Sequence, residues 1–284
     1  MTTTDLPPGV RELTFAGALS RHAGTGPTAL LSLTDEEMLA LLNDPDDSSV
    51  HLPWVTAQES SPAGFDRTQG RLTAMRSLLA RGVVGPESAV AAAERRAVDG
   101  DPGRLVATGL ATGIITRRRA AATTVEMVDE IVPRGALCLY VDRDGTTLQE
   151  QVSTQGLHHF TMLDVADAIG NARTFCAPGL PSPADAAAPA AGARDGAVWT
   201  GPHDSFRSDP ELLRITGEIL SCSHVRVRGA EAAGELRILT TTRSLLLVQP
   251  AESAPEEALE AVPLQLPELE QLLDHLLTAA LSRS

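Results

Sequence analysis

The stretch Gly135-Ala-Leu-Cys-Leu-Tyr-Val141, followed by Asp142-Arg-Asp-Gly145 and Thr146-Thr-Leu-Gln-Glu-Gln-Val152, decides the fold class of this chain. Two runs rich in Leu, Val and Thr flank an Asp-Gly dipeptide, which supplies the left-handed backbone that tight hairpin turns need. The pattern therefore predicts an antiparallel pair of strands. The turn also resembles part of a calcium-binding loop, but the other ligands of such a loop are missing, so we interpret it as a hairpin turn.

A second segment of the chain repeats this pattern. Gly234–Thr240 aligns with Gly135–Val141, and Leu259–Leu264 aligns with Leu157–Met162. Each segment is predicted to run strand–strand–strand–helix. We expect an α+β fold of antiparallel sheets with flanking helices. One interpretation is a duplicated unit with pseudo-two-fold symmetry, and the other is that any antiparallel α+β chain gives such matches.

Composition divides the chain into five parts. The predicted parts are a partly disordered N-terminal segment (1–29), a helical part (30–100), a first β-rich unit ending in a helix (101–176), an Ala/Pro-rich loop (177–200) and a second β-rich unit with a C-terminal helix (201–284).

Local signals place the elements within these parts. Thr34-Asp-Glu-Glu37 is a capping box that begins a helix, and Asp66 with Gln69 begins another. Residues 44–65 are predicted to form a polar loop. The residues of 106–115 and 120–131 include many Thr, Val and Ile, which favour strands. Pro267 begins a last helix with a strong leucine stripe.

The charge and composition exclude several classes of partner. The chain has 23 basic and 37 acidic residues, a net charge of −14, and only 3% aromatic residues. Such a surface repels nucleic acid and anionic lipid, and it offers few rings on which bases could stack. It could attract a basic partner, although simple solvation explains it as well. Every basic residue is Arg, which with abundant Ala indicates a high-GC genome.

The number of cysteines and the length of the apolar runs indicate in which cellular compartment the protein is expected. The three cysteines, Cys138, Cys176 and Cys222, are widely spaced and odd in number, which does not indicate a disulfide framework. The chain shows no signal-peptide pattern, and its apolar runs are far shorter than a membrane span. We therefore expect a cytoplasmic protein with no membrane partner and no nucleic-acid partner.

Several residues are candidates for chemistry. Adjacent residues on a strand point to opposite faces, so His158 and His159 are expected to lie one toward the core and one toward solvent, and not to share a metal ion. Cys222 and His224 would share one face of a strand and could form half a zinc site, but no second pair stands at ligand spacing. Gly109-Leu-Ala-Thr-Gly113 has no following Lys, which argues against a phosphate-binding loop.

Two further groups could bind a partner. Arg117-Arg118-Arg119 could hold an acidic partner or a phosphate, or could form a solvated turn between strands. Trp54 and Trp199 could anchor a partner, or could belong to small satellite cores. No catalytic, cofactor-binding or metal-binding residue is predicted, and no cofactor is expected.

The order of elements resembles the EspG family, the cytosolic chaperones of type VII (ESX) secretion. The resemblance covers roughly residues 30–280. It rests on Leu31-Ser-Leu-Thr-Asp-Glu-Glu-Met-Leu-Ala-Leu-Leu42, on Leu78-Leu-Ala-Arg-Gly-Val83 and on Gly156-Leu-His-His-Phe160 leading into a helix. It implies a quasi-symmetric antiparallel sheet flanked by helices and a non-enzymatic role in keeping small, helical secreted proteins soluble. No binding residue of the family is carried over to this chain.

Three functional hypotheses follow. The leading one is a non-enzymatic chaperone or adaptor that binds a small helical or secreted protein. The second is a ligand-sensing transcriptional regulator, which the acidic N-terminal part opposes because it has no basic recognition helix. The third is an enzyme whose site is assembled in space from scattered residues and shows no sequence motif.

Overall fold

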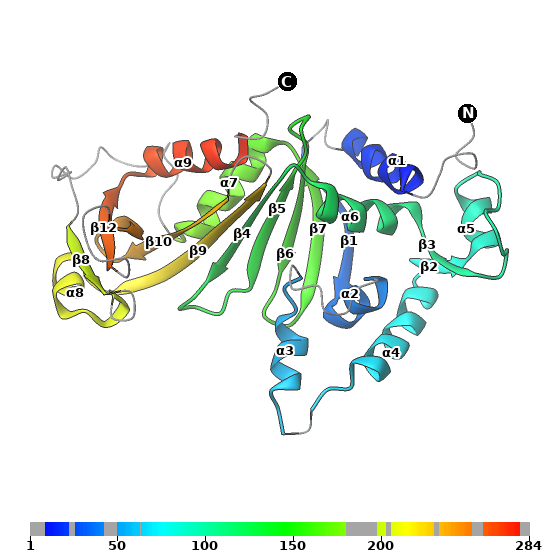
Figure 1. Ribbon diagram of the computed structural model, residues 1–284, viewed down its shortest axis with the longest axis horizontal. Helices are drawn as coiled ribbons and strands as arrows, with labels where there is room; N and C mark the ends of the chain where they lie inside the picture. Colours follow the sequence, from blue (N-terminus) through cyan, green and yellow to red (C-terminus); the bar gives the residue numbers. More distant parts are fainter. Residues whose placement is uncertain are drawn as a thin grey trace. The chain divides into compact units, whose positions relative to one another are not determined.

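We describe a computed structural model of the chain, shown in Figure 1, over residues 9–22, 26–42, 50–62, 64–179, 198–202, 206–229, 233–251 and 258–278. The chain divides into two compact units. Unit 1 contains Met1–Ala121 and Thr146–Asp164, and unit 2 contains Ala122–Gly145 and Val165–Ser284. Both combine helices with antiparallel strands. The predicted fold class, α+β with antiparallel sheets and flanking helices, is confirmed.

Unit 1 contains three strands of the large antiparallel sheet, in the order β1 (Thr28–Thr34), β7 (Leu157–Leu163) and β6 (Thr147–Val152). Leu33 of β1 lies opposite His158 of β7. In β7 the residues at 158, 160 and 162 are buried, whereas those at 157 and 159 are exposed. This alternation is what a strand with one covered face requires.

The helices of unit 1 surround these strands and a small sheet of β2 (Val84–Pro86) and β3 (Leu105–Ala107). The helical elements are α1 (Val10–Leu19), η2 (Ser20–His22), α2 (Asp35–Leu41), α3 (Pro53–Glu59), α4 (Arg67–Ala80), α5 (Glu87–Ala93) and α6 (Gly109–Ala120).

Two helix starts were predicted correctly. Thr34 accepts a hydrogen bond from the backbone of Glu37, and the Glu37 carboxylate accepts one from the backbone of Thr34, so the capping box is complete. Asp66 caps α4. The predicted polar loop over 44–65 is partly wrong, because Pro53 begins α3 inside it.

The predicted strand over 106–115 is wrong, because most of it belongs to α6. Thr108 caps the helix by accepting a hydrogen bond from the backbone of Ala111. Ala111, Ile114 and Ile115 then recur at helical spacing and are buried. The intrinsic strand preference of Ile and Thr is worth less than about 0.7 kcal/mol per residue against a helix. Burial of an apolar helical face outweighs it.

Two glycines allow α6 to approach α1 closely. A Cβ atom at Gly113 would lie 2.9 Å from the carbonyl oxygen of Phe15, and one at Gly109 would lie 2.6 Å from the Phe15 ring. The two helices lie side by side in Figure 1. Gly109 and Gly113 are therefore packing residues between helices, and not a phosphate-binding loop.

Unit 2 contains seven strands of the large antiparallel sheet, in the order β5, β4, β9, β10, β11, β12 and β8. Their bounds are β4 (Thr123–Asp129), β5 (Ala136–Val141), β8 (Trp199–Pro202), β9 (Ile219–Gly229), β10 (Gly234–Thr241), β11 (Leu245–Pro250) and β12 (Ala258–Leu264). The helical elements are α7 (Val165–Cys176), η3 (Phe206–Ser208), α8 (Pro210–Thr216) and α9 (Leu266–Thr278).

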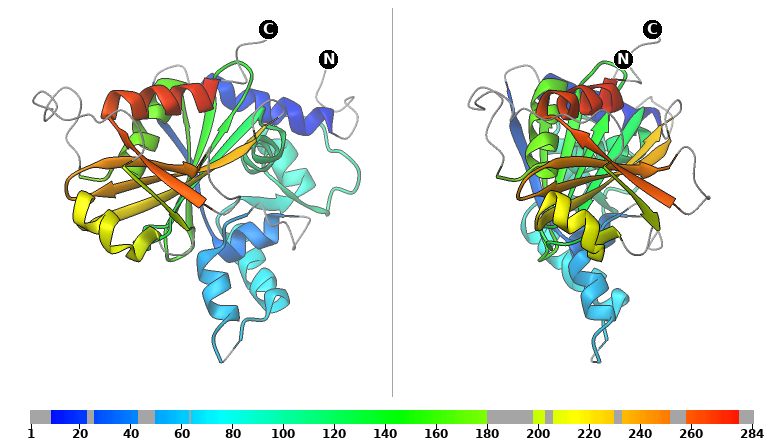
Figure 2. Two further views of the ribbon diagram at one scale, coloured as in Figure 1. Left: turned by 60° about the vertical axis from the view of Figure 1, so that its left-hand side comes forward. Right: turned by 90° about the vertical axis from the view of Figure 1, so that its left-hand side faces the viewer.

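The long helices of unit 2 cover one side of its strands. Figure 2 shows α9 lying along the strands, and α9 packs against α7. Leu269, Leu273 and Leu277 of α9 are fully buried, as the predicted leucine stripe requires. A second cluster contains Trp199, Leu212 of α8 and residues of β9 to β12. Trp199 is thus a core residue, in agreement with the satellite-core interpretation.

The element order repeats along the chain. Four strands, β4 to β7, precede α7, and four strands, β9 to β12, precede α9. The first strands of the two series, β4 and β9, pair antiparallel, with Glu126 opposite Arg226. A pseudo-two-fold axis relating the two series would pair their first strands antiparallel, and β4 and β9 pair in this way. The predicted repeat had three strands per unit, whereas the described order has four.

Residues 1–8 and 23–25 of the N-terminal segment (1–29) and most of the Ala/Pro-rich loop (177–200) lie outside the described residues. The described part of the N-terminal segment, predicted to be partly disordered, contains α1 and η2. Gly145 has a φ of +81° and donates its N–H to the carbonyl of Asp142, as expected for the Asp-Gly turn. Among the described helices, none is long and apolar enough to cross a membrane.

Candidate functional site

A groove of about 680 Å³ with both polar and apolar lining lies on unit 1. Four helices and two short strands line it: α1, α2, α4, α6, β2 and β3. Leu13 of α1 and Leu105 of β3 stand at this groove with 56% and 48% of their surface exposed. The other large apolar side chains that line it are Leu41, Met75, Val84, Val106 and Ile115.

The apolar surface continues along α4. Leu72, Met75 and Leu79 follow each other at i, i+3 and i+7, so they lie on one side of the helix. Leu72 and Leu79 are both exposed, and Met75 lines the groove. Of the residues of α4, only Ala74 and Leu78 are buried. Exposed apolar side chains that gather in this way mark surfaces that bind partners.

A buried polar network holds β6, β7 and the start of α2 together in unit 1. Nδ1 of His158 lies 2.6 Å from Oε1 of Glu150, and Nε2 lies 2.8 Å from Oδ1 of Asp35. The second oxygen of Asp35 accepts from the backbone N–H of Val55 at 2.9 Å, and Arg118 donates to Glu150 at 2.8 Å. His158 and Asp35 are completely inaccessible to solvent.

The charge state of His158 follows from this geometry. Burial lowers the pKa of His158, but hydrogen bonds to Asp35 and Glu150 and the charges of these carboxylates outweigh burial and raise it. Both ring nitrogens face carboxylate oxygens, which accept hydrogen bonds, so both must carry a proton. His158 is therefore a buried imidazolium ion that joins three elements, and it is closed to any substrate.

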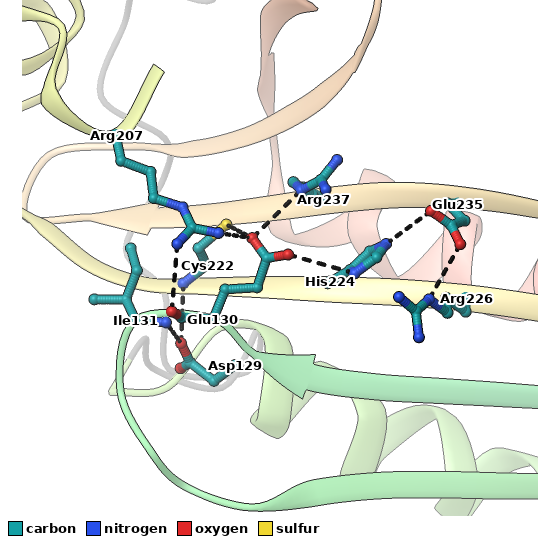
Figure 3. A network of polar contacts seen from close by, with 9 residues as sticks. All are labelled: Asp129, Glu130, Ile131, Arg207, Cys222, His224, Arg226, Glu235 and Arg237. Carbon is teal, nitrogen blue, oxygen red and sulfur yellow. Dashed lines mark hydrogen bonds and ion pairs between the residues drawn. The ribbon is translucent and has the colours of Figure 1, made fainter. Parts of the chain in front are cut away.

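A second polar network lies on unit 2 and is drawn in Figure 3. Its centre is Glu130, directly after β4. One oxygen of Glu130 accepts from Arg207 and, at 3.3 Å, from Arg237, and the other lies 3.4 Å from Nδ1 of His224. Nε2 of His224 lies 3.2 Å from Glu235. The network thus alternates in charge across β4, η3, β9 and β10.

The turn after β4 fixes the position of Glu130. One carboxylate oxygen of Asp129 accepts from the backbone N–H groups of Ile131 and Val132, each at 2.9 Å. The other oxygen of Asp129 pairs with Arg134. Burial raises the pKa of Glu130, but the charges of Arg237 and Arg207 outweigh this effect and lower the pKa.

Cys222, His224 and Glu130 meet in this network, as a nucleophile, a base and an orienting carboxylate would. The Cys222 thiol donates to Glu130 at 3.6 Å. Burial and the Glu130 charge raise the pKa of Cys222 to about 12, so its thiol is protonated at neutral pH and is a poor nucleophile. Burial and the charges of Arg237 and Arg226 lower the pKa of His224.

The sequence left open half a zinc site at Cys222 and His224. Cys222 and His224 do share one face of β9, since both contact Glu130. Within the described residues, however, no group of three or more His, Cys, Asp or Glu side chains is arranged to hold a metal ion. The guanidinium groups of Arg207 and Arg237 balance the charge of the Glu130 carboxylate.

The two adjacent histidines point to opposite faces, as predicted. His158 is buried, whereas His159 is exposed and its Nδ1 lies 2.8 Å from the Ser32 hydroxyl. Trp54 lies in α3 and packs edge-on against Phe65, with 5.5 Å between ring centroids. It is half-buried, which fits the satellite-core interpretation.

The arginine run does not form a solvated turn between strands, and that interpretation is wrong. Arg117, Arg118 and Arg119 occupy the last turn of α6, where positive charge suits the helix dipole. Arg117 is buried and donates to Thr146 and to Ser20. Arg118 is buried on Glu150, and Arg119 alone is exposed and lines the groove.

The groove residues were missed at the sequence level. Leu13 falls in the segment predicted to be partly disordered, and Leu105 lies in β3, directly before the stretch 106–115 that was predicted as a strand. A helical period in Val10–Leu19, flanked by Pro7-Pro8-Gly9, was the signal that could have identified α1.

Comparisons of this chain with models of known protein families and with curated proteins find no match.

Proposed function

We propose that this chain is a non-enzymatic chaperone or adaptor that binds a helical segment of a partner protein in the groove of unit 1. The observation that supports this proposal is the pair of half-exposed leucines, Leu13 and Leu105, which face one groove from two different elements. A groove lined by helices with apolar contacts is how many proteins bind an amphipathic helix.

Exposure of these side chains has a free-energy cost that a partner removes. Full burial of a Leu side chain stabilises by about 1.5–3 kcal/mol relative to leaving it in water. Leu13, Leu105 and the α4 stripe together expose several such side chains on one unit. A partner helix that covers them gains this hydrophobic free energy without any change of fold in unit 1.

The polar networks support binding rather than chemistry. The acidic and basic groups of both networks are paired with each other, and they join secondary-structure elements. Burial raises the pKa of Cys176, like that of Cys222, to about 12. The third cysteine, Cys138, is also buried. Thiols in such surroundings do not supply a nucleophile at neutral pH.

The resemblance to the EspG family adds a narrower form of the proposal. In that form the partner is a small, helical, secreted protein of a type VII system, held in the cytoplasm before export. A helix-binding groove is compatible with such a partner.

The test is co-expression of the full chain with the small helical proteins encoded beside its gene. A one-to-one complex is expected by size-exclusion chromatography with light scattering. Leu13→Asp and Leu105→Asp should each abolish it, because they place a charge where the partner's apolar face lies. Leu220→Asp is the matched control, since Leu220 is 43% exposed on β9 of unit 2. A complex that tolerates both groove substitutions, or no complex with any candidate, contradicts the proposal.

A further inference from the structure

We infer that the occupant of the groove is an amphipathic helix that carries one acidic and one basic residue beside its apolar stripe. This inference rests on the proposed function and specifies the chemistry of the partner. It depends on three features of the groove: its small lining residues, the short strand at its wall and the two charges that line it.

The lining leaves room for large side chains. Small residues from α2, β3 and α6 and from the cap of α1 stand between the larger ones: Gly9, Ala40, Ala107, Ala111, Thr112 and Ala120. With its volume of about 680 Å³, the groove can take several Leu, Met or Phe side chains. Side chains at i, i+3 or i+4, and i+7 of one helix would reach it together, because these positions share a helix face.

The wall formed by β3 favours a helix over an extended peptide. The strand is only three residues long, Leu105–Ala107, and all three pair with β2 on one edge. An added partner strand would find at most a few backbone groups on the other edge. Strand addition gains its affinity from a long ladder of backbone hydrogen bonds, which β3 is too short to provide.

Two ionisable side chains line the groove, and they have opposite charge. Glu12 lies in the first turn of α1, and Arg119 lies in the last turn of α6. Both are exposed, and within the described residues neither side chain has a hydrogen bond or an ion pair. A partner helix with an acidic residue against Arg119 and a basic residue against Glu12 satisfies both charges.

The balance of these charges sets the groove apart from the rest of the chain. The whole chain carries a net charge of −14, whereas the groove carries one positive and one negative group. A merely basic partner, which the overall charge would attract, therefore places a like charge against Arg119. The groove selects a helix of mixed charge.

Three synthetic peptides test this inference against the full chain. Each is an 18-residue helix with the same leucine stripe, and the residues flanking that stripe are one Glu and one Arg, two Glu, or two Arg. Fluorescence anisotropy measures their binding to wild type, to Glu12→Arg and to Arg119→Glu. The peptides with two Glu or two Arg present the same charges in either orientation of the helix. The mixed peptide can bind in the orientation that places its Glu against Arg119 and its Arg against Glu12. The comparison therefore does not require the binding direction to be known.

The expected result is a matched pattern. Wild type prefers the mixed peptide, Glu12→Arg prefers the peptide with two Glu, and Arg119→Glu prefers the peptide with two Arg. Each best match should bind about tenfold more tightly than the worst mismatch, since exposed pairs contribute modestly and each mismatch adds repulsion. The preferences should weaken at high salt.

Other outcomes separate the two proposals. If all three peptides bind equally, and binding is lost in Leu13→Asp, the groove binds helices without regard to charge and this inference alone fails. If a strand-forming peptide of the same composition binds more tightly than the helical one, the inference also fails. If no peptide binds, or binding survives Leu13→Asp and Leu105→Asp, the groove is not the binding site and the proposed function fails with it.

Discussion

Replacing His158 by alanine should destabilise unit 1 severely. His158 joins β7 to β6 through Glu150 and to the start of α2 through Asp35, at 2.6 and 2.8 Å. The substitution leaves two carboxylates in a place that water does not reach. Val55 still donates a hydrogen bond to Asp35, and Arg118 still donates one to Glu150, so each carboxylate keeps one hydrogen-bond donor.

The size of the effect follows from the burial. Removing one partner of a buried ion pair costs about 3–5 kcal/mol, because the remaining charge has lost its compensation. Domains are typically stable by only about 5–15 kcal/mol, so the variant should approach the limit of folding at 25 °C. His159→Ala is the matched control. Its ring is exposed on the opposite face, and its loss should cost no more than about 0.5 kcal/mol.

The effect should depend on pH with a defined sign. The pKa of His158 is raised in the folded chain above its unfolded value of about 6.5. A group with a raised pKa contributes stability that is fully present below the unfolded value and is lost as pH rises through the folded value. The groups that face the ring are Asp35 and Glu150, with Arg118 on Glu150. The gap in free energy of unfolding between wild type and His158→Ala should therefore be widest near pH 6 and should narrow as pH rises.

Urea unfolding of the full chain, followed by circular dichroism at pH 6 and pH 9, measures this gap. A loss below about 1 kcal/mol at pH 6 would show that His158 is not a buried charge partner. A gap that widens with rising pH would show that the ring is neutral in the folded state. Equal effects of His158→Ala and His159→Ala would refute the burial argument altogether.

Three further predictions concern packing and charge. Gly113→Ala should destabilise by about 1–3 kcal/mol, because its Cβ would lie 2.9 Å from a carbonyl oxygen of α1, and thermal unfolding measures the loss. Gly17→Ala is the control: no atom lies within 4 Å of its added Cβ, so it should be neutral or slightly stabilising. Cys222 should react with a thiol reagent at neutral pH only after unfolding, since it is buried and its pKa is raised to about 12; rapid labelling of the native chain would contradict this. Glu130→Gln should cost about 1.5–3 kcal/mol near neutral pH, the usual value of hydrogen bonds to a charged group. Because the pKa of Glu130 is lowered in the folded chain, this contribution should be present above pH about 4.3 and be lost as pH falls further, which chemical denaturation at pH 7 and pH 3 would show.

Local chemistry explains which elements could be predicted from the sequence. The capping box at Thr34 and the cap at Asp66 were found because a cap is a contact between residues three apart. The Asp-Gly turn and the leucine stripe of α9 are equally local. The repeated strand pattern predicted most of the strands of unit 2, although four strands rather than three precede each of α7 and α9.

Helix α6 shows where local reasoning fails. Its Thr and Ile residues favour strands, and its two glycines weaken a helix further. The glycines are needed because α1 lies against them, and α1 is distant in sequence. No pattern within 109–120 contains that information. The groove was missed for the same reason, since its walls come from α1, α2, α4, α6, β2 and β3 and exist only when these elements meet.

Two histidines in this chain show why contact partners alone do not fix function. His158 and His224 each lie between two carboxylates, yet the pKa of the first is raised and that of the second is lowered. His158 has short contacts in complete burial, whereas His224 has contacts of 3.2 and 3.4 Å and two arginines nearby. In both places the ionisable groups satisfy one another and hold elements of the fold together. Among the described residues at the groove, Leu13, Leu105, Glu12 and Arg119 have exposed side chains without such a structural task. A partner that uses these side chains needs no change in either network, so binding at the groove is compatible with the fold as it stands.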